Sequence, residues 1–133
     1  MYELFCPVHK SQNTLNAAHR LFHMSSTFIL ASGSEIRSEL LTRAGVAHQV
    51  GPARIDEGMV RDSLLAEEAR PRDVADTLAE LKARKVSEKH PDVLVLGCDQ
   101  VLDHGGVILS KAQSPEEAEE QLKSMRNRRH MLL

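Results

Sequence analysis

Residues 28–41 read Phe-Ile-Leu-Ala-Ser-Gly-Ser-Glu-Ile-Arg-Ser-Glu-Leu-Leu. The first four residues form a short apolar run typical of a β-strand, and the Ser-Gly-Ser turn ends that run. Apolar side chains then recur at helical spacing, at Ile36, Leu40 and Ala44, until Gly45 supplies a C-cap. The stretch therefore predicts a strand, a turn and a helix in direct succession.

The same alternation of strands and helices continues along the chain. Val46–Val50 is predicted as a second strand, and Arg54–Gly58, which follows a Gly-Pro pair, as a loop. A helix is expected from about Arg72, with its buried face marked by Val74, Leu78 and Leu81. Val93–Leu96 is an uninterrupted apolar run, which is the pattern of a strand covered on both faces.

The last third of the chain predicts a hairpin and a helix. Val101–Asp103 and Val107–Leu109 flank a His-Gly-Gly turn, whose glycines permit a positive φ. Ser114 begins a helix as its N-cap, with Pro and Glu in the first turn, and residues 131–133 begin a further strand. Together these elements indicate an α/β protein.

Length and composition indicate a single soluble domain. The chain has 133 residues, 41% hydrophobic and 27% charged, which is the balance of a globular protein. A net charge of −2 and an aromatic content of 3% argue against a nucleic-acid polymer as partner, because they offer neither a basic field nor stacking surfaces. No apolar run is long enough to span a membrane. Cys6 and Cys98 lack zinc or disulfide spacing, so a reducing cytoplasm is expected.

Residues 1–26 differ from the rest in having no steady apolar period. We expect an N-terminal extension that packs little over residues 1–23, with Met24 a candidate natural start. The alternative is a real helix around Asn13–His23. The body of the protein is expected to be residues 27–133.

The turn after the first strand is a candidate anion site. Small residues at a strand-to-helix junction leave backbone N–H groups at the positive end of a helix dipole, where Ser32 and Ser34 stand. Arg37 lies one turn into the helix, where its guanidinium could reach the same anion. The alternative is that Ser32 or Ser34 only caps the helix.

Carboxylates supply the second candidate site. Asp56 and Glu57 lie in the predicted loop, and Asp99 follows the apolar strand, at the sheet edge where ligands of open α/β sheets gather. Carboxylate oxygens are the ligands that Mg²⁺ prefers. Asp99 could instead accept only backbone hydrogen bonds at the strand end.

Two lysines, Lys82 and Lys111, complete the candidate residues. A lysine in an apolar row usually extends its amine to water, so each alone has an ordinary structural explanation. Together with Arg37 they would present three positive charges to a triphosphate.

Five segments, in this order, resemble the motifs of the Maf family. Leu30–Leu41 is similar to its opening Leu-Ala-Ser-x-Ser-Pro-Arg-Arg-x-x-Leu-Leu signature, and Ile55–Glu57 to its Asp-Glu loop. Leu81–Ala83 resembles the family's Glu-Lys-Ala helix, Gly97–Val101 its Gly-Ala-Asp-Thr-Val strand end, and Ile108–Lys111 its Leu-Gly-Lys-Pro turn.

The resemblance implies a mixed central sheet with flanking helices, of the Maf or ITPase-like type, and a nucleoside triphosphate pyrophosphatase. It implies hydrolysis of a (d)NTP or modified NTP to the monophosphate and pyrophosphate, with Mg²⁺ or Mn²⁺ as the divalent cofactor, and it allows a homodimer. The residues that it implies are Asp99 as proton acceptor, Glu57 and Asp99 as metal ligands, Lys82 among the catalytic cations, and Ser32, Ser34, Arg37, Gln100 and Lys111 in substrate binding.

The chain departs from the family pattern at three positions. Glu35 and Ile36 replace the usual Pro and first Arg, which removes one cation from the anion turn and adds a carboxylate. Gln100 replaces a Thr that helps to set base choice, so the resemblance assigns no preferred nucleotide.

The resemblance covers residues 27–133, whereas the family's chain continues, so we expect the domain to be incomplete at its C-terminus. Two alternatives to an active enzyme follow. One is a catalytically impaired protein that binds a nucleotide or a partner and is linked to control of the division septum. The other is a fragment without function.

Overall fold

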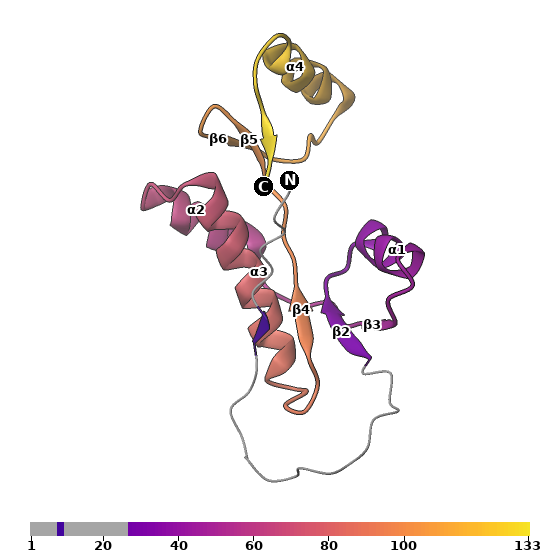
Figure 1. The fold of residues 1–133 in the computed structure, drawn as a ribbon. Helices are drawn as coiled ribbons and strands as arrows, with labels where there is room; N and C mark the ends of the chain where they lie inside the picture. The colour runs from indigo at the N-terminus through magenta and orange to yellow at the C-terminus, as the bar shows by residue number, and fades with distance from the viewer. Residues whose placement is uncertain (1–7, 10–26) are drawn as a thin grey trace. The chain divides into compact units, whose positions relative to one another are not determined.

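The computed structural model describes residues 8–9 and 27–133, which form an α/β arrangement (Figure 1). Its elements are β1 (Val8–His9), β2 (Phe28–Ala31), α1 (Glu35–Arg43), β3 (His48–Val50), α2 (Glu57–Ala66), α3 (Pro71–Ser87), β4 (Val95–Gly97), β5 (Leu102–His104), β6 (Val107–Leu109), α4 (Pro115–Met125) and β7 (Met131–Leu132). They fall into two compact units. The first comprises the chain up to Ile55 together with Ala79–Cys98, and the second comprises Asp56–Leu78 and Asp99–Leu133.

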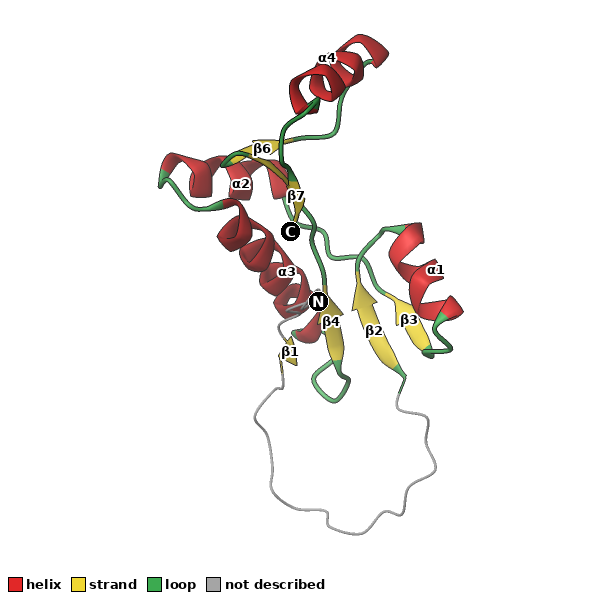
Figure 2. Cartoon of the chain, turned by 45° about the horizontal axis from the view of Figure 1, so that its top comes forward, coloured by secondary structure: helices red, strands yellow, loops and turns green. Residues whose placement is uncertain are grey.

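A mixed four-stranded sheet, with the order β1-β4-β2-β3, organises the first unit (Figure 2). β2 pairs in parallel with both β3 and β4, and the β2–β4 register ends with Ala31 opposite Gly97. The expectation that the two apolar runs are neighbouring strands with adjacent carboxyl ends is confirmed. The bounds of β2 agree with the predicted strand.

The backbone of Val8–His9 adds an antiparallel strand to β4. The expectation that residues 1–23 pack little against the rest is wrong at these two residues. The other residues of the predicted extension, including Met24 and the alternative helix at Asn13–His23, lie outside the described part of the chain.

Two strands begin later than the sequence predicts, and in each case a turn occupies the first residues. Val46 donates its N–H to the Leu41 carbonyl at 2.9 Å, and Gly45, with φ of +71°, donates to Thr42 at 3.0 Å. This is a Schellman motif, which closes α1 and delays β3. Before β4, the Val93 N–H donates to the His90 carbonyl at 3.2 Å, so the strand starts only after this turn.

The core of the first unit lies between the sheet and the second half of α3. Ile29, Ala31, Val95, Ala83 and Val86 form its buried apolar cluster. β4 and α3 approach closely because Gly97 has no side chain. A Cβ at Gly97 would overlap the backbone carbonyl of Ala79 and would lie 2.9 Å from the Ala83 Cβ.

The structure corrects the prediction of a loop over Arg54–Gly58. Only its first part is irregular, because Asp56 is the N-cap of α2 and accepts a hydrogen bond from the Met59 N–H at 3.0 Å. Glu57 is therefore the first residue of a helix. None of the α2 residues is buried.

The second unit contains a three-stranded antiparallel sheet with the order β6-β5-β7. Gly105 and Gly106 have φ of +64° and +92° in the predicted β5–β6 hairpin turn, which is confirmed. The expected strand near residues 131–133 is β7, which pairs with β5. α4 begins as predicted, with the Ser114 hydroxyl accepting from the Glu117 N–H at 3.1 Å.

No helix within the described ranges is both long enough and apolar enough to cross a membrane.

The close approach of β4 to α3 predicts that Gly97→Ala destabilises the fold. The new methyl group would meet backbone, which cannot rotate away, so we expect the free energy of unfolding to fall by at least about 2 kcal/mol. The matched control is Gly58→Ala in α2, where the added Cβ lies 3.5 Å from an Asp56 carboxylate oxygen. Alanine favours a helix, so the control should be neutral or stabilising by up to about 1 kcal/mol. Urea unfolding followed by circular dichroism measures both changes, and a G97A protein as stable as the parent would contradict the packing described.

Candidate functional site

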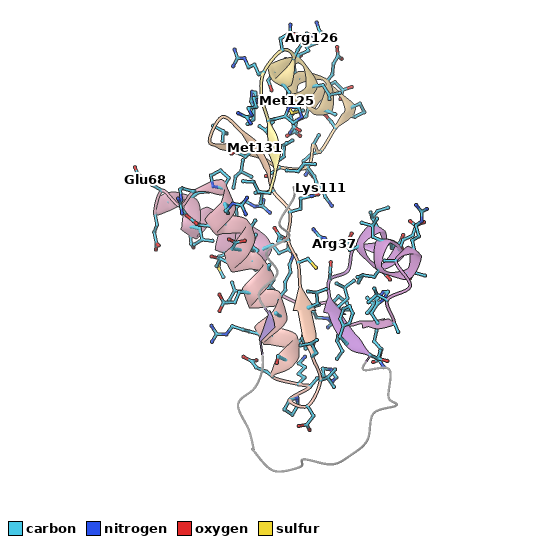
Figure 3. The ribbon with its side chains drawn as sticks, viewed as in Figure 1. Arg37, Glu68, Lys111, Met125, Arg126 and Met131 are labelled. Atoms are coloured by element: carbon cyan, nitrogen blue, oxygen red, sulfur yellow. The ribbon has the colours of Figure 1, made fainter. Side chains whose placement is uncertain are left out.

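The turn between β2 and α1 brings three of the predicted anion-binding residues together. Ser32 is buried, with 3% of its surface exposed, directly after Ala31. Its Oγ accepts hydrogen bonds from the Arg37 Nη1 at 3.0 Å and from the Ser34 N–H at 3.3 Å. The first bond orients the guanidinium across the first turn of α1, where Figure 3 labels Arg37. A guanidinium held by one of its five N–H groups keeps the others for a ligand.

The N-terminus of α1 is not closed by a side-chain cap. Ser34 stands at the N-cap with extended backbone angles, but its side chain makes no capping hydrogen bond. Asp56 and Ser114 do cap α2 and α4 with their side chains. The first N–H groups of α1 have no carbonyl one turn earlier in the helix, so they are directed away from it. The alternative that Ser32 or Ser34 caps the helix holds in position, since Ser34 is the N-cap residue, but its side chain makes no capping hydrogen bond.

Glu35 follows directly in this turn and is exposed. A carboxylate near a helix N-terminus interacts favourably with the helix dipole, so it competes with an external anion for the same positive potential. Ile36, at the position of the missing arginine, leaves 64% of its surface exposed. The turn thus retains one guanidinium, from Arg37.

Lys82 is buried, with 6% of its surface exposed, although lysines on apolar rows usually reach water. The buried positions of α3 repeat at Val74, Leu78, Lys82 and Val86, which confirms the predicted row and places the lysine within it. Leu81, which was expected on the buried face, is only partly buried. Taking an ammonium out of water costs free energy that its surroundings must offset, so such a lysine is more informative than an exposed one.

The predicted carboxylates belong to the second unit. Glu57 is the first residue of α2 and is partly buried. Asp99 is also partly buried and comes two residues after Gly97, the last residue of β4. Gln100 follows it as an exposed residue before β5. Asp56 accepts the capping hydrogen bond of α2, so its role is structural.

Lys111 is exposed in the segment between β6 and α4, where it is labelled in Figure 3. Two neighbouring elements hold this segment. Arg61, on α2, donates to the Ser110 Oγ at 3.2 Å, and Gln121, on α4, donates to the Ser110 carbonyl at 3.0 Å. The Lys111 carbonyl also accepts from the Gln113 side chain at 2.9 Å. Sequence reasoning missed these supports, because nothing in the local pattern pairs Arg61 with a residue so far along the chain.

Glu57 and Asp99 carry carboxylates, the oxygen ligands that Mg²⁺ prefers. Within residues 8–9 and 27–133, no three or more His, Cys, Asp or Glu side chains are grouped so that they could hold a metal by themselves. Mg²⁺ usually takes one or two protein carboxylates and completes its shell with water and substrate phosphates. Two carboxylates are within the number that Mg²⁺ usually takes from a protein.

Ion pairs on exposed surfaces explain the pKa shifts of Arg70, Asp73 and Lys123. Hydrogen bonds from Arg70, at 2.8 and 3.0 Å, lower the pKa of Asp73, and the same contact raises the pKa of Arg70. Glu119 and Glu120 raise the pKa of Lys123 on α4. None of these residues was predicted in the site, and such exposed pairs add little stability.

A family model and several curated proteins are similar to most of this chain. A family model described as Maf-like protein matches residues 27–133. A protein named nucleoside triphosphate pyrophosphatase from Roseobacter denitrificans is 60% identical over 110 residues, which are 83% of this chain and 55% of the relative. Proteins of the same name from Ruegeria sp. strain TM1040 and Ruegeria pomeroyi are 58% and 57% identical over equal lengths. The chain spans about half the length of these curated relatives.

The two bonds to Ser32 predict that Ser32→Ala and Ser34→Ala differ in effect. Ser32→Ala removes the acceptor of the Arg37 guanidinium and of a backbone N–H, so we expect a loss of about 1–3 kcal/mol in the free energy of unfolding. Ser34→Ala removes a hydroxyl without a capping bond, and its effect should stay within about 0.5 kcal/mol. Urea denaturation of the two variants checks the order, and a larger loss for S34A would contradict the hydrogen bonding at this turn.

Proposed function

This chain belongs to the Maf-like protein family, and on that premise we propose that it acts as a nucleoside triphosphate pyrophosphatase. The proposed reaction converts a nucleoside triphosphate, a (d)NTP or a modified one, to the monophosphate and pyrophosphate. The observation that carries the proposal is the anion turn, where an uncapped helix N-terminus and the Ser32-bound Arg37 guanidinium share one short segment. The printed names of the relatives support the reaction class.

In the proposed mechanism the anion turn and the cations hold the triphosphate. The N–H groups at the start of α1 and the guanidinium of Arg37 would donate hydrogen bonds to phosphate oxygens. Lys82 and Lys111 would add positive charge against the negative charge that develops on the leaving pyrophosphate. The burial of Lys82 strengthens its expected contribution, because an ammonium shielded from water interacts more strongly with a nearby phosphate. Ser34 and Gln100 are proposed to contact the substrate.

Asp99 is proposed as the general base. It would accept a proton from the water that attacks the α-phosphorus, while the bond from that phosphorus to the bridging oxygen breaks and pyrophosphate leaves. The parallel register supports this role, since Ala31 lies opposite Gly97 and both strands therefore leave the sheet at the same edge. Ser32 follows Ala31 by one residue, and Asp99 follows Gly97 by two.

A divalent cation, Mg²⁺ or Mn²⁺, held by Glu57 and Asp99, would neutralise phosphate charge when bound. We propose the cytoplasm as the place of action, since nucleoside triphosphates are its ordinary constituents, and a homodimer as an assembly open to test.

Asp99→Asn should separate chemistry from binding. The amide keeps the shape of the side chain and cannot accept the proton, so turnover should fall by about 10²–10⁴ while nucleotide affinity changes little. The matched control is Asp92→Asn, an exposed aspartate in the turn before β4, which should keep parental turnover. Pyrophosphate release from a panel of nucleoside triphosphates with Mg²⁺ or Mn²⁺, together with calorimetric binding, measures both quantities.

The assay should be run on the 133-residue chain and on a fusion that appends the remaining length of the Roseobacter relative. If neither parent releases pyrophosphate from any nucleotide, the enzyme proposal fails. Binding without turnover would instead favour a catalytically silent nucleotide-binding protein. Parental turnover in D99N would make Asp99 structural, and Glu57 would be the next carboxylate to replace.

A further inference from the structure

Helix α1 carries the anion turn, yet apolar packing holds it only weakly. None of its nine residues is buried, and the side chains of Ile36 and Leu40 leave 64% and 59% of their surfaces exposed. A helix of this length without a buried face is not stable by itself in water. Polar contacts must therefore contribute to holding α1, and with it Arg37, in place.

One such contact joins α1 to β3, the edge strand of the four-stranded sheet. The Ser38 Oγ lies 2.8 Å from the His48 Nε2, and both side chains are partly buried. Ser38 is the residue after Arg37, so a bond to its side chain fixes the turn of helix from which the guanidinium extends.

Two further contacts fix the imidazole ring itself. Its Nδ1 lies 3.0 Å from the Val46 carbonyl oxygen. A carbonyl only accepts, so Nδ1 carries a proton, and in the neutral ring the Nε2 lone pair accepts from the Ser38 hydroxyl. The ring also stacks on Phe28, its partner in the β2–β3 register, with centroids 6.1 Å apart and planes inclined by 28°.

We propose that His48 is a positioning residue, which holds Arg37 and the start of α1 at the anion turn through Ser38. Stacking on Phe28 of β2 and the contact with the Val46 carbonyl hold the imidazole ring in place. The ring in turn orients the Ser38 hydroxyl, and this hydrogen bond holds α1 against β3. This inference rests on the proposed function, because Arg37 needs a fixed direction only if it binds phosphate. His48 itself makes no contact with the substrate in this account.

Ser38→Ala tests the inference with little cost to the helix, because alanine has the highest helix propensity. We expect the affinity of the 133-residue chain for inorganic pyrophosphate, measured by calorimetry, to fall about 2- to 10-fold, as for the loss of one hydrogen bond. Ser38→Thr keeps the hydroxyl and should restore parental affinity. The control is Thr42→Ala, whose hydroxyl donates only within the helix, to the Ser38 carbonyl at 2.9 Å, and it should bind like the parent.

His48→Phe keeps a ring to stack on Phe28 but has no nitrogen. It should weaken binding as S38A does, and the double variant S38A/H48F should be no weaker than either single variant, because both remove the same bond. Parental affinity in S38A, or additive losses in the double variant, would overturn the inference. If H48F fails to fold, the comparison of S38A with S38T decides the question.

Two ligand-free measurements separate this inference from the proposed function. Long-range ¹H–¹⁵N NMR should find His48 protonated at Nδ1 in the neutral ring, and amide hydrogen exchange in α1 should be about 2- to 10-fold faster in S38A than in T42A. Protonation at Nε2, or equal exchange in S38A and the parent, contradicts the role of His48. Absence of pyrophosphate binding by a parent that passes both measurements contradicts the proposed function.

Discussion

The parallel pairing of β2 with β4 is the constraint on which the rest of the first unit depends. It joins two segments that are far apart in the chain, and its register places Ala31 opposite Gly97. Gly97 is also the point where the sheet meets α3, because only a residue without a side chain fits against the backbone of Ala79. The buried apolar cluster and the place of the turn at Ser32 follow from this pairing.

The elements that the sequence predicted well are those with a strong local signal. The apolar run of β2, the glycine that closes α1, the Gly-Gly hairpin turn and the capped start of α4 each depend on residues close in sequence. Helix α2 was missed although Val60 and Leu64 stand at helical spacing in it, and none of its residues is buried. The burial of Lys82 could not be predicted either, since an isolated lysine on an apolar row usually reaches solvent.

The candidate site combines firmly and weakly held parts. Ser32 is buried and its hydroxyl is bonded twice, whereas the helix that carries Arg37 has no buried residue. The contacts that support such parts, Ser38 with His48 and Arg61 with Ser110, are side-chain hydrogen bonds between elements that only the folded chain brings together. The sequence therefore points to candidate substrate-binding residues, but not to the side chains that hold them.

The most direct test of the account is to map where a phosphate chain binds. Backbone ¹H–¹⁵N spectra of the 133-residue chain, recorded while inorganic pyrophosphate is added, report every amide at once. We expect the largest shifts at residues 33–37, because the N–H groups at the start of α1 would donate to phosphate oxygens. Shifts confined to other segments, or none at pyrophosphate concentrations well above those of cellular nucleotides, would contradict it.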